Sequence, residues 1–549
     1  MNIPDALIAR LFSIRNRYGK QFALEKMQLL QTINIKTAKN KKAVQECYAA
    51  MEFLIAYPDN KTIYERSNQL LQQLQEYLIT NENLRYHLYN SGITNTTFCA
   101  AFSFELVKWL RKTRPKEIKL RSIDADDAQV RFVLQVVMPK VESEIFQDAN
   151  AEWKGWLQHL KKQDEDLLDQ LIAIFDSSDI RPEVKDELWN KLGMYVEITF
   201  TSHCCLPPSL TRLYYQRSLI KKEIKKQTPV FTPIRVKLTE NEAEQIIACS
   251  RMIMLANLRE IDPISYTSAK LVSYYHLPRG ISVALMGMVT ERRHPIDSYM
   301  GYMVFKNGLP VAYAASWILF NSGRIGLNVF YNYRGGESKY IFKQVLELHR
   351  KVYRLKRFTV DPYQVGKNNS DGIHSGAFWM YYHLGFRPIQ KIQLELATAE
   401  DVKIKSNNAY RSPVPVLKTL ANSRLELVLQ KSAVSFDATD ISRAYAGILT
   451  KKYNGNRLLA EKGAAIKLAN ILLVKNYHED NMKFILKNWA VLLLSNEKEL
   501  RYNNALKKML KKLFVLKAGG SEEAYIAGLQ QAVDLRKFIE PILKKYVTD

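Results

Sequence analysis

The spacing of apolar residues divides this chain into successive parts. Over residues 1–230 apolar side chains recur every three or four positions, which predicts amphipathic helices separated by polar turns. Residues 231–400 alternate short apolar runs, typical of strands, with helical segments. Helical spacing returns over 438–549, after a polar stretch with prolines at 401–437. We therefore expect an α/β domain with a mixed central sheet at 231–400, a linker at 401–437, and mainly α-helical N- and C-terminal regions on either side.

The central part opens with a predicted strand at Pro233–Leu238. Thr239 has the side chain of a helix N-cap, and acidic residues follow it in the first turn of a predicted helix that runs through Glu242–Leu258. A second short helix is expected at Ser268–Tyr275, and a strand at Gly280–Met288. The order strand, two helices, strand therefore precedes the most regular stretch of the chain.

A hairpin and a glycine-containing turn mark that regular stretch. Ser298–Phe305 and Leu309–Phe320 flank Asn307-Gly308, a two-residue hairpin signal. A third strand is expected at Arg324–Phe330, after which Tyr333-Arg334-Gly335-Gly336-Glu337-Ser338 opens a helix at Lys339–Val352. The pattern then predicts a strand, a short helix and a closing strand, at Arg357–Val360, Gly376–His383 and Ile389–Leu396.

Two of these motifs resemble the acyl-CoA-binding core of the GNAT superfamily of N-acyltransferases. The first is the strand, Arg334-Gly335-Gly336 turn and helix, and the second is Ala377-Phe378-Trp379-Met380-Tyr381-Tyr382-His383-Leu384-Gly385-Phe386, which is similar to the family's Ala-x-x-x-Tyr-x-x-x-Gly-Phe signature. The resemblance covers roughly residues 232–395. It implies a GNAT-like α/β fold, acetyl-CoA or another acyl-CoA as co-substrate, and an unidentified amine as acceptor.

The turn has residues suited to a phosphate. Two glycines let the backbone approach an anion without a Cβ collision, and the helix that follows presents its positive end. The resemblance places the CoA pyrophosphate there, near Phe330, Tyr333, Arg334, Gly335, Gly336, Ser338 and Lys339. Glu337 is a departure, because the family has a small residue near this position and a carboxylate suits a pyrophosphate only when it points away.

The resemblance also implies a catalytic set. Tyr381 stands where the family's tyrosine donates a proton to the departing thiolate, and a neutral hydroxyl suits that role. The strand before the turn lacks the carboxylate that many family members carry there. Glu260, Asp361 and His374 remain as candidates for the base, and each has a purely structural role as its alternative.

The net charge of +25 lies almost wholly in residues 201–549. An anionic partner explains this asymmetry, as does a solvated basic face. CoA, a nucleic acid and a membrane surface are all anionic, and nucleic acid is not favoured, since the basic residues of the last hundred positions are spread over several helices. Thr211–Lys226 is expected as a lysine-rich helix before the domain boundary.

Five cysteines in 549 residues do not form a disulfide framework. His203-Cys204-Cys205 has metal-ligating side chains, but adjacent cysteines suit one tetrahedral ion poorly, and we expect no metal. No apolar run approaches the length of a membrane span, and the N-terminus lacks the pattern of a signal peptide. We expect a cytoplasmic protein.

Three functions remain open. The first is an acyl-CoA-dependent N-acyltransferase, most simply an N-acetyltransferase. The second is a non-catalytic GNAT-fold scaffold or CoA sensor whose helical regions bind protein or nucleic acid. The third is an aminoacyl-tRNA-dependent transferase, since related folds serve that purpose and the chain is basic.

Overall fold

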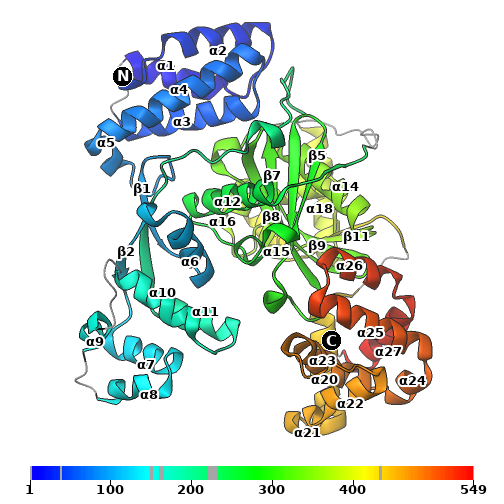
Figure 1. Ribbon diagram of the computed structural model, residues 1–549. Helices are drawn as coiled ribbons and strands as arrows, with labels where there is room; N and C mark the ends of the chain where they lie inside the picture. Colours follow the sequence, from blue (N-terminus) through cyan, green and yellow to red (C-terminus); the bar gives the residue numbers. More distant parts are fainter. Residues whose placement is uncertain are drawn as a thin grey trace.

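A computed structural model gives the fold of this chain, which Figure 1 shows from blue at the N-terminus to red at the C-terminus. Four parts follow one another: a helical N-terminal part, a small α/β part, a large central sheet with its helices, and a C-terminal helical bundle. The structure describes residues 3–37, 40–148, 152–159, 166–220, 231–407, 409–431 and 436–547.

The first part is a group of antiparallel helices built around α3. The side chains of Asn40 and Asn60 cap α3 and α4 by accepting from Ala43 and Ile63 N–H. Most of α3 is buried, so this helix is the core of the group. The five helices are α1 (Ile3–Ile14), α2 (Lys20–Thr32), α3 (Lys41–Ala56), α4 (Lys61–Thr80) and α5 (Glu82–His87).

The second part contains a three-stranded antiparallel sheet in the order β1-β3-β2, which the sequence analysis did not predict. Its helices pack around Phe104, Phe175 and Trp189, whose rings lie within 6 Å of one another. The elements are β1 (Thr97–Ala101), α6 (Phe104–Thr113), β2 (Ile118–Ile123), α7 (Asp127–Val137), α8 (Lys140–Ser143), α9 (Trp153–His159), α10 (Leu167–Ser177), α11 (Pro182–Lys191) and β3 (Met194–Thr199). The N-terminal region is mainly helical, as expected, with this sheet in addition.

The central part is a mixed sheet in the order β12-β13-β11-β9-β8-β7-β6-β5-β4, with β10 paired to β8. Among the strands that the structure describes here, β9 and β11 are the one parallel pair. The strands are β4 (Ile234–Val236), β5 (Val272–Leu277), β6 (Ile281–Met286), β7 (Ser298–Lys306), β8 (Leu309–Leu319), β9 (Ser322–Ile325), β10 (Asn328–Val329), β11 (Arg357–Val360), β12 (Arg387–Pro388) and β13 (Leu425–Val428).

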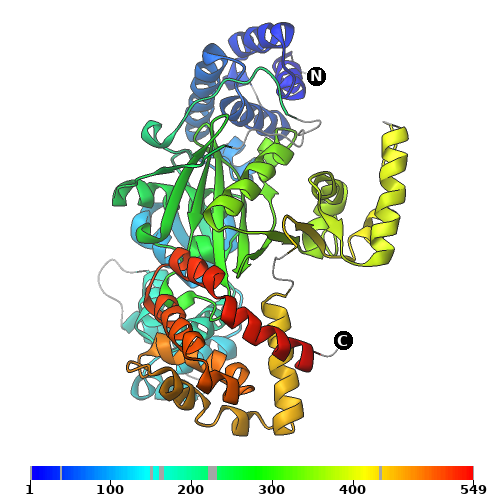
Figure 2. The ribbon, with the colours of Figure 1, turned by 90° about the vertical axis from the view of Figure 1, so that its right-hand side faces the viewer.

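Helices cover both faces of this sheet. The α13 residue Pro263 approaches Gly301 of β7 on one face, whereas on the other face His349 of α14 contacts Tyr302 and Ser316. The helices of this part are α12 (Glu240–Ala256), α13 (Asp262–Ser265), α14 (Ser338–Val352), α15 (Pro362–Val365), α16 (Ser370–His374), α17 (Ala377–His383), α18 (Lys391–Ser406) and α19 (Val414–Leu420). Figure 2 shows that α18, in yellow, stands away from the rest of the chain.

Most local predictions in this part are confirmed. Thr239 and Glu242 form a capping box at the start of α12. The Asn307-Gly308 turn has φ of 50° and 83° and joins β7 to β8. The strand expected at Arg357–Val360 is present with those bounds.

Other predictions are wrong. Ser268–Tyr275 does not form the expected helix: it has one 3₁₀ turn at Ala269–Leu271, and its second half is strand β5 between two partner strands. The closing strand expected at Ile389–Leu396 is largely the start of α18. The stretch 401–437, expected as a linker, contains α19 and strand β13, which lies between β11 and β12 in the sheet.

The lysine-rich helix expected at Thr211–Lys226 is also wrong in its first part, where Thr211–Ile220 has no helix. The remainder, 221–226, lies outside the described residues.

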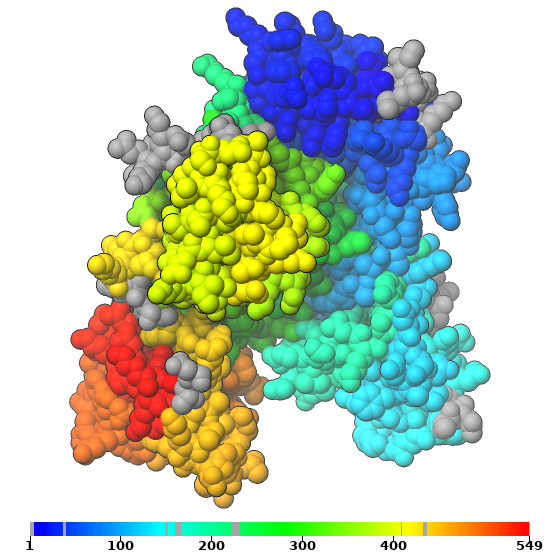
Figure 3. Space-filling view, turned by 180° about the vertical axis from the view of Figure 1, so that it is seen from behind, coloured from blue at the N-terminus to red at the C-terminus, as the bar shows by residue number. Residues whose placement is uncertain are grey.

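The C-terminal part is a helical bundle, as expected. Side chains of this bundle hold the loop before β7: Trp489 donates to the Pro295 carbonyl at 3.0 Å and Tyr525 donates to that of Ile296 at 2.7 Å. The helices are α20 (Ala438–Tyr453), α21 (Arg457–Glu461), α22 (Ala464–Leu472), α23 (Asp480–Leu494), α24 (Glu497–Tyr502), α25 (Asn504–Gly519), α26 (Glu522–Gln531) and α27 (Val533–Tyr546). Figure 3 shows a notch between this bundle, in orange, and the second part, in cyan.

Within these described ranges, no helix is both long enough and apolar enough to cross a bilayer.

Candidate functional site

The strand pairing of the central sheet changes next to β9. β11 pairs with β9 from Ser322 to Arg324, but the chain then bends at Gly326-Leu327, and the continuation β10 pairs with β8 alone. The strand expected at Arg324–Phe330 is therefore interrupted. Beyond this bend β11 ends at Val360 and the chain enters α15, so β10 and β11 do not pair with each other. We call this place, where the pairing of the two neighbouring strands stops, the divergence.

Tyr381 lies at this bend. Its ring packs edge-on against Phe342 of α14, with centroids 5.2 Å apart, and its side chain is 1% exposed. Burial raises the pKa of Tyr381, and a hydrogen bond from the backbone of Leu327 opposes the rise. The predicted tyrosine is thus neutral, oriented, and directed at the interruption between β9 and β10.

Gly326 completes the bend. Its carbonyl accepts from the Tyr302 hydroxyl, and a Cβ on Gly326 would lie 2.8 Å from Cδ of Gln364. Gln364 belongs to α15, which follows β11, so this side chain fills the space beside Gly326 where the strands part. A ligand that reaches Tyr381 from this side displaces Gln364.

The glycine turn is positioned by the N-terminal helices. Gly335 has φ of 87°, and its carbonyl accepts a long hydrogen bond from Asn16 at 3.5 Å. A Cβ on Gly336 would lie 2.9 Å from the Tyr57 ring. The Tyr57 hydroxyl accepts from the backbone N–H of Glu337, and burial raises the pKa of Tyr57. The backbone N–H of Glu337, in the turn that was expected to bind a phosphate, therefore already has a hydrogen-bond partner.

Tyr333 does not face the turn's outer surface. It is 1% exposed, and its hydroxyl donates to the buried carboxylate of Glu52 in α3. Phe330 is also buried and stacks on Tyr313 of β8, with ring centroids 5.1 Å apart. Tyr333 and Phe330, which were predicted to bind the cofactor, therefore pack on the buried side of the turn.

Glu337 points into the protein. Its carboxylate accepts from Arg279 at 2.6 Å, from the Gln216 amide at 2.9 Å and from the Ile220 N–H at 2.9 Å. Lys306 Nζ lies 3.8 Å from the same carboxylate, and burial lowers the pKa of Lys306 to about 7 although Glu337 opposes this. Glu337 thus belongs to a buried ion cluster behind the turn.

Because Glu337 is turned inward, its side chain does not cap α14. Arg334 is half-exposed at the turn and pairs with Asp371 of α16 at 2.8 Å. Lys339 lies in the first turn of α14, where burial and the charge of Lys343 lower its pKa. The helix start therefore combines unbonded peptide dipoles with positive side chains.

The three candidate bases have different positions. The Glu260 carboxylate accepts from Ser103 N–H at 3.1 Å and from the Ser265 hydroxyl at 2.7 Å, so it joins the second part to α13. His374 is exposed at the end of α16. Asp361 directly follows β11 and caps α15 by accepting from Tyr363 N–H. Of the three, only Asp361 stands at the end of a strand that borders the divergence.

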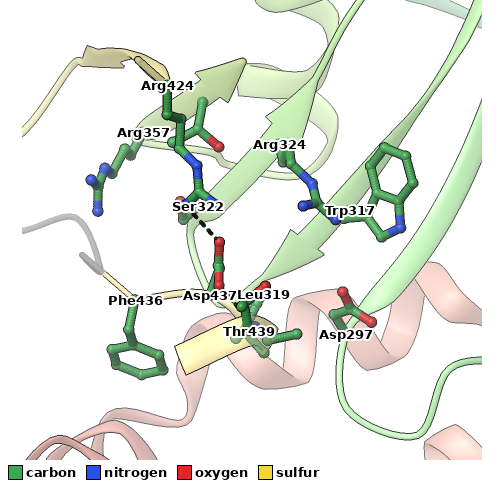
Figure 4. Close-up of a pocket in the computed structure, with 12 residues that line it drawn as sticks. Asp297, Trp317, Leu319, Ser322, Arg324, Arg357, Arg424, Phe436, Asp437 and Thr439 are labelled. Carbon is green, nitrogen blue, oxygen red and sulfur yellow. Dashed lines mark hydrogen bonds and ion pairs between the residues drawn. The ribbon is translucent and has the colours of Figure 1, made fainter. Parts of the chain in front are cut away.

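A second feature lies on these strands, and Asp361 is linked to it only through Arg324. Figure 4 shows a pocket between β9, β11 and the start of α20. Arg324 stacks over Trp317 and lies 3.9 Å from Asp361, while Arg424 pairs with Asp437 at 2.8 Å. Its cavity of about 30 Å³ has room for one or two waters. The pocket joins the bundle to the sheet and is too small for a substrate.

Sequence reasoning missed the residues that hold the turn from a distance. Tyr57, Gln216, Arg279 and Lys306 come from four segments remote from Glu337, and no local pattern links them. Gln364 lies in the segment after β11, for which the sequence analysis named only Asp361.

The sequence matches no model of a known protein family, no curated protein and no solved structure. Within the described part of the chain, no group of three or more His, Cys, Asp or Glu side chains is arranged to hold a metal ion.

Proposed function

We propose that the central part of this chain is an acyl-CoA-dependent N-acyltransferase, with acetyl-CoA as the first co-substrate to test and an unidentified amine as acceptor. The proposal rests on the position of the Tyr381 side chain, which reaches the backbone at the divergence between β10 and β11. An uncapped helix start with Arg334 and Lys339 lies at the same end of the sheet. The resemblance to the GNAT superfamily makes this divergence the expected position of the thioester.

The chemistry assigns one role to each group. Exposed backbone amides of diverging strands hold the extended arm of the acyl-CoA, and the start of α14 binds its phosphates. The amine attacks the thioester carbon, the carbon–sulfur bond breaks, and Tyr381 donates a hydrogen bond or proton to the departing sulfur. Asp361, at the rim, receives the proton that the amine loses.

This proposal requires one local movement. Tyr381 is 1% exposed, and Gln364 lies against Gly326 at the divergence. A shift of α15 (Pro362–Val365), a single helical turn, opens that side without breaking a strand. Loops beside a rigid sheet commonly serve as such lids.

One observation favours a second function. The Tyr57 hydroxyl occupies the Glu337 N–H, and its ring covers Gly336, so the N-terminal helices take part of the surface that a pyrophosphate would use. In a non-catalytic scaffold of the same fold, this contact would be permanent. In the enzyme, the phosphates bind beside Tyr57, at Ser338 and Lys339.

Turnover distinguishes the two functions. The protein is incubated with acetyl-CoA and a panel of primary amines, and free CoA thiol is measured. The enzyme releases thiol in an amine-dependent reaction, and Tyr381→Phe lowers the rate by about 10²–10⁴-fold, as expected for a positioned acid. Tyr382→Phe is the matched control, because it removes a hydroxyl from the neighbouring position of α17 and should have a milder effect.

Equal rates in the native protein and Tyr381→Phe would make that tyrosine structural. If acetyl-CoA binds but no amine increases thiol release, the scaffold or sensor function replaces the enzyme.

A further inference from the structure

We propose that one surface of the C-terminal bundle docks on a phospholipid bilayer with anionic headgroups. Figure 1 shows α21, α22 and α24 along the side of the bundle that lies away from the central sheet. We call the exposed residues of 457–473 and 498–512, which include these helices and the start of α25, the outer rim. The proposal is independent of the acyl-transfer chemistry, because the residues assigned to that chemistry belong to the central part.

Large apolar side chains of the outer rim stand in solvent. Leu458 of α21 is 84% exposed, Leu473 at the end of α22 is 73% exposed, and Tyr502 at the end of α24 is 81% exposed. Leu459 and Ile466 are exposed as well. A single exposed apolar residue is ordinary, but several on adjoining short helices form a patch, and such patches commonly mark a docking surface.

Contacts between the helices place these side chains on one surface. A hollow on the outer rim is lined by Ile466 of α22, by Arg501 of α24 and by Gly463, which lies between α21 and α22. At the other end of α22, the Leu473 carbonyl accepts from Lys511 of α25. Side chains of four successive helices therefore share the outer rim.

Leu473 is held in solvent by an unfavourable backbone conformation. It caps the C-terminus of α22 with φ of 54° and ψ of 48°, the left-handed region in which glycine and asparagine are preferred. The leucine side chain does not offset this strain by packing, because it is mostly exposed. A partner that covers the side chain gives a reason for a leucine at this position.

Cations surround the apolar side chains. Residues 457–512 contain twelve Lys or Arg and five Asp or Glu. Lys467 and Arg501 share one carboxylate, that of Glu497, at 2.6 and 2.8 Å. Exposed cations of α24 and α25 on the outer rim are Lys498, Arg501, Lys508, Lys511 and Lys512. This excess of positive charge is complementary to anionic headgroups, and basic residues beside exposed apolar ones are typical of segments that bind at a membrane surface.

A bilayer fits this composition better than the other partners do. Leucine and isoleucine have no planar face on which a nucleic-acid base stacks, whereas they enter the apolar edge of a bilayer. Tyr502 suits the interface between headgroups and acyl chains, because its ring is apolar and its hydroxyl is polar. A second copy of this chain would bring the same cations face to face in a two-fold dimer.

The test measures vesicle binding by the full chain. The protein is sedimented at physiological salt with vesicles of phosphatidylcholine, or of phosphatidylcholine containing one-third phosphatidylserine. Each basic residue near an anionic surface strengthens binding by about fivefold, so binding to the phosphatidylserine vesicles should be tighter by about tenfold or more. Equal affinity for the two kinds of vesicle, or binding to neither, overturns the proposal.

Two double variants separate the apolar and the charged contributions. Leu458→Ser/Leu473→Asn should weaken vesicle binding by about tenfold or more without lowering the melting temperature, because asparagine adopts the left-handed conformation more readily than leucine. Lys508→Gln/Lys511→Gln removes two cations one turn apart on α25 and should reduce the preference for phosphatidylserine by about tenfold or more. Leu24→Ser is the matched control, because Leu24 is 67% exposed on α2, in the N-terminal part, and this variant should bind as the native protein does.

Native vesicle binding by folded Leu458→Ser/Leu473→Asn overturns the proposal, as does an equal loss of binding in Leu24→Ser. Duplex DNA is added in a parallel titration. If the native protein binds the DNA, the lysine variant weakens that binding and the leucine variant leaves vesicle binding unchanged, the outer rim serves a nucleic acid and the bilayer proposal fails.

Discussion

Glu337→Gln is the substitution with the largest predicted effect on stability. The native carboxylate is fully buried and accepts from Arg279, Gln216 and the Ile220 backbone, with Lys306 at 3.8 Å. Glutamine keeps the size of the side chain but removes the charge, and its amide nitrogen must face a donor. The variant therefore leaves the buried Lys306 and the partly buried Arg279 without their counter-charge.

The magnitude follows from those contacts. Breaking a buried ion pair by removing one partner typically costs about 3–5 kcal/mol. For a cooperative unit of about 200 residues, each kcal/mol lowers the melting temperature by about 2–4 °C, so a decrease of roughly 6–20 °C is expected. Arg334→Gln is the control, because the half-exposed Arg334–Asp371 pair at the other side of the same turn is worth under about 1 kcal/mol.

Differential scanning calorimetry at two pH values makes the test specific. Since the pKa of Lys306 is about 7, the lysine is charged at pH 6 and neutral at pH 9 in the native protein. The decrease in melting temperature caused by Glu337→Gln should therefore be larger at pH 6 than at pH 9. At pH 6 the native carboxylate neutralises two cations, whereas at pH 9 it neutralises Arg279 alone. A melting temperature within 2 °C of native, or a decrease no larger than that of Arg334→Gln, would show that the buried Glu337 cluster does not stabilise the fold.

Two further predictions concern acid stability and ligand binding. Burial lowers the pKa of His349 from 6.5 to about 4, so the unfolded chain takes up a proton between these values and the folded protein does not. The free energy of unfolding that neutral His349 contributes is therefore complete above pH 6.5 and falls by about 3 kcal/mol as the pH approaches 4. Urea unfolding should show a smaller loss of stability over this pH interval in His349→Gln than in the native protein. An equal loss in the two proteins contradicts the assignment to His349. In calorimetry, the double variant Arg334→Gln/Lys339→Gln should bind acetyl-CoA at least tenfold more weakly than native protein. The control variant Arg350→Gln, at the far end of α14, should bind with native affinity. Equal affinities of the double variant and the native protein would exclude the start of α14 as the phosphate site.

The parts of the fold that the sequence predicted are those with local signals. The Asn307-Gly308 hairpin has a turn that requires positive φ, and α12 begins with a capping box. The four-residue strand β13 (Leu425–Val428) was missed because it is short and lies in a polar stretch, and it becomes a strand only through pairing on both sides.

The structure places Tyr381 at the interruption of the strand, and its catalytic role stays a prediction. The residues that surround the turn from a distance were not predicted. The buried environment of Glu337 depends on Arg279 and Lys306, and the cover over Gly336 depends on Tyr57. Such contacts join segments far apart in the chain, so neither spacing nor composition indicates them.

The most direct test of the proposed function is a calorimetric titration of the native protein with acetyl-CoA, repeated with Gln364→Ala. We expect saturable binding of one acetyl-CoA per chain and a melting temperature that rises with ligand concentration, because the ligand binds only the folded state. Gln364→Ala should bind more tightly, since the side chain that fills the divergence is removed. Absence of heat and of any thermal shift at millimolar acetyl-CoA, in both proteins, would show that the central part does not bind acyl-CoA.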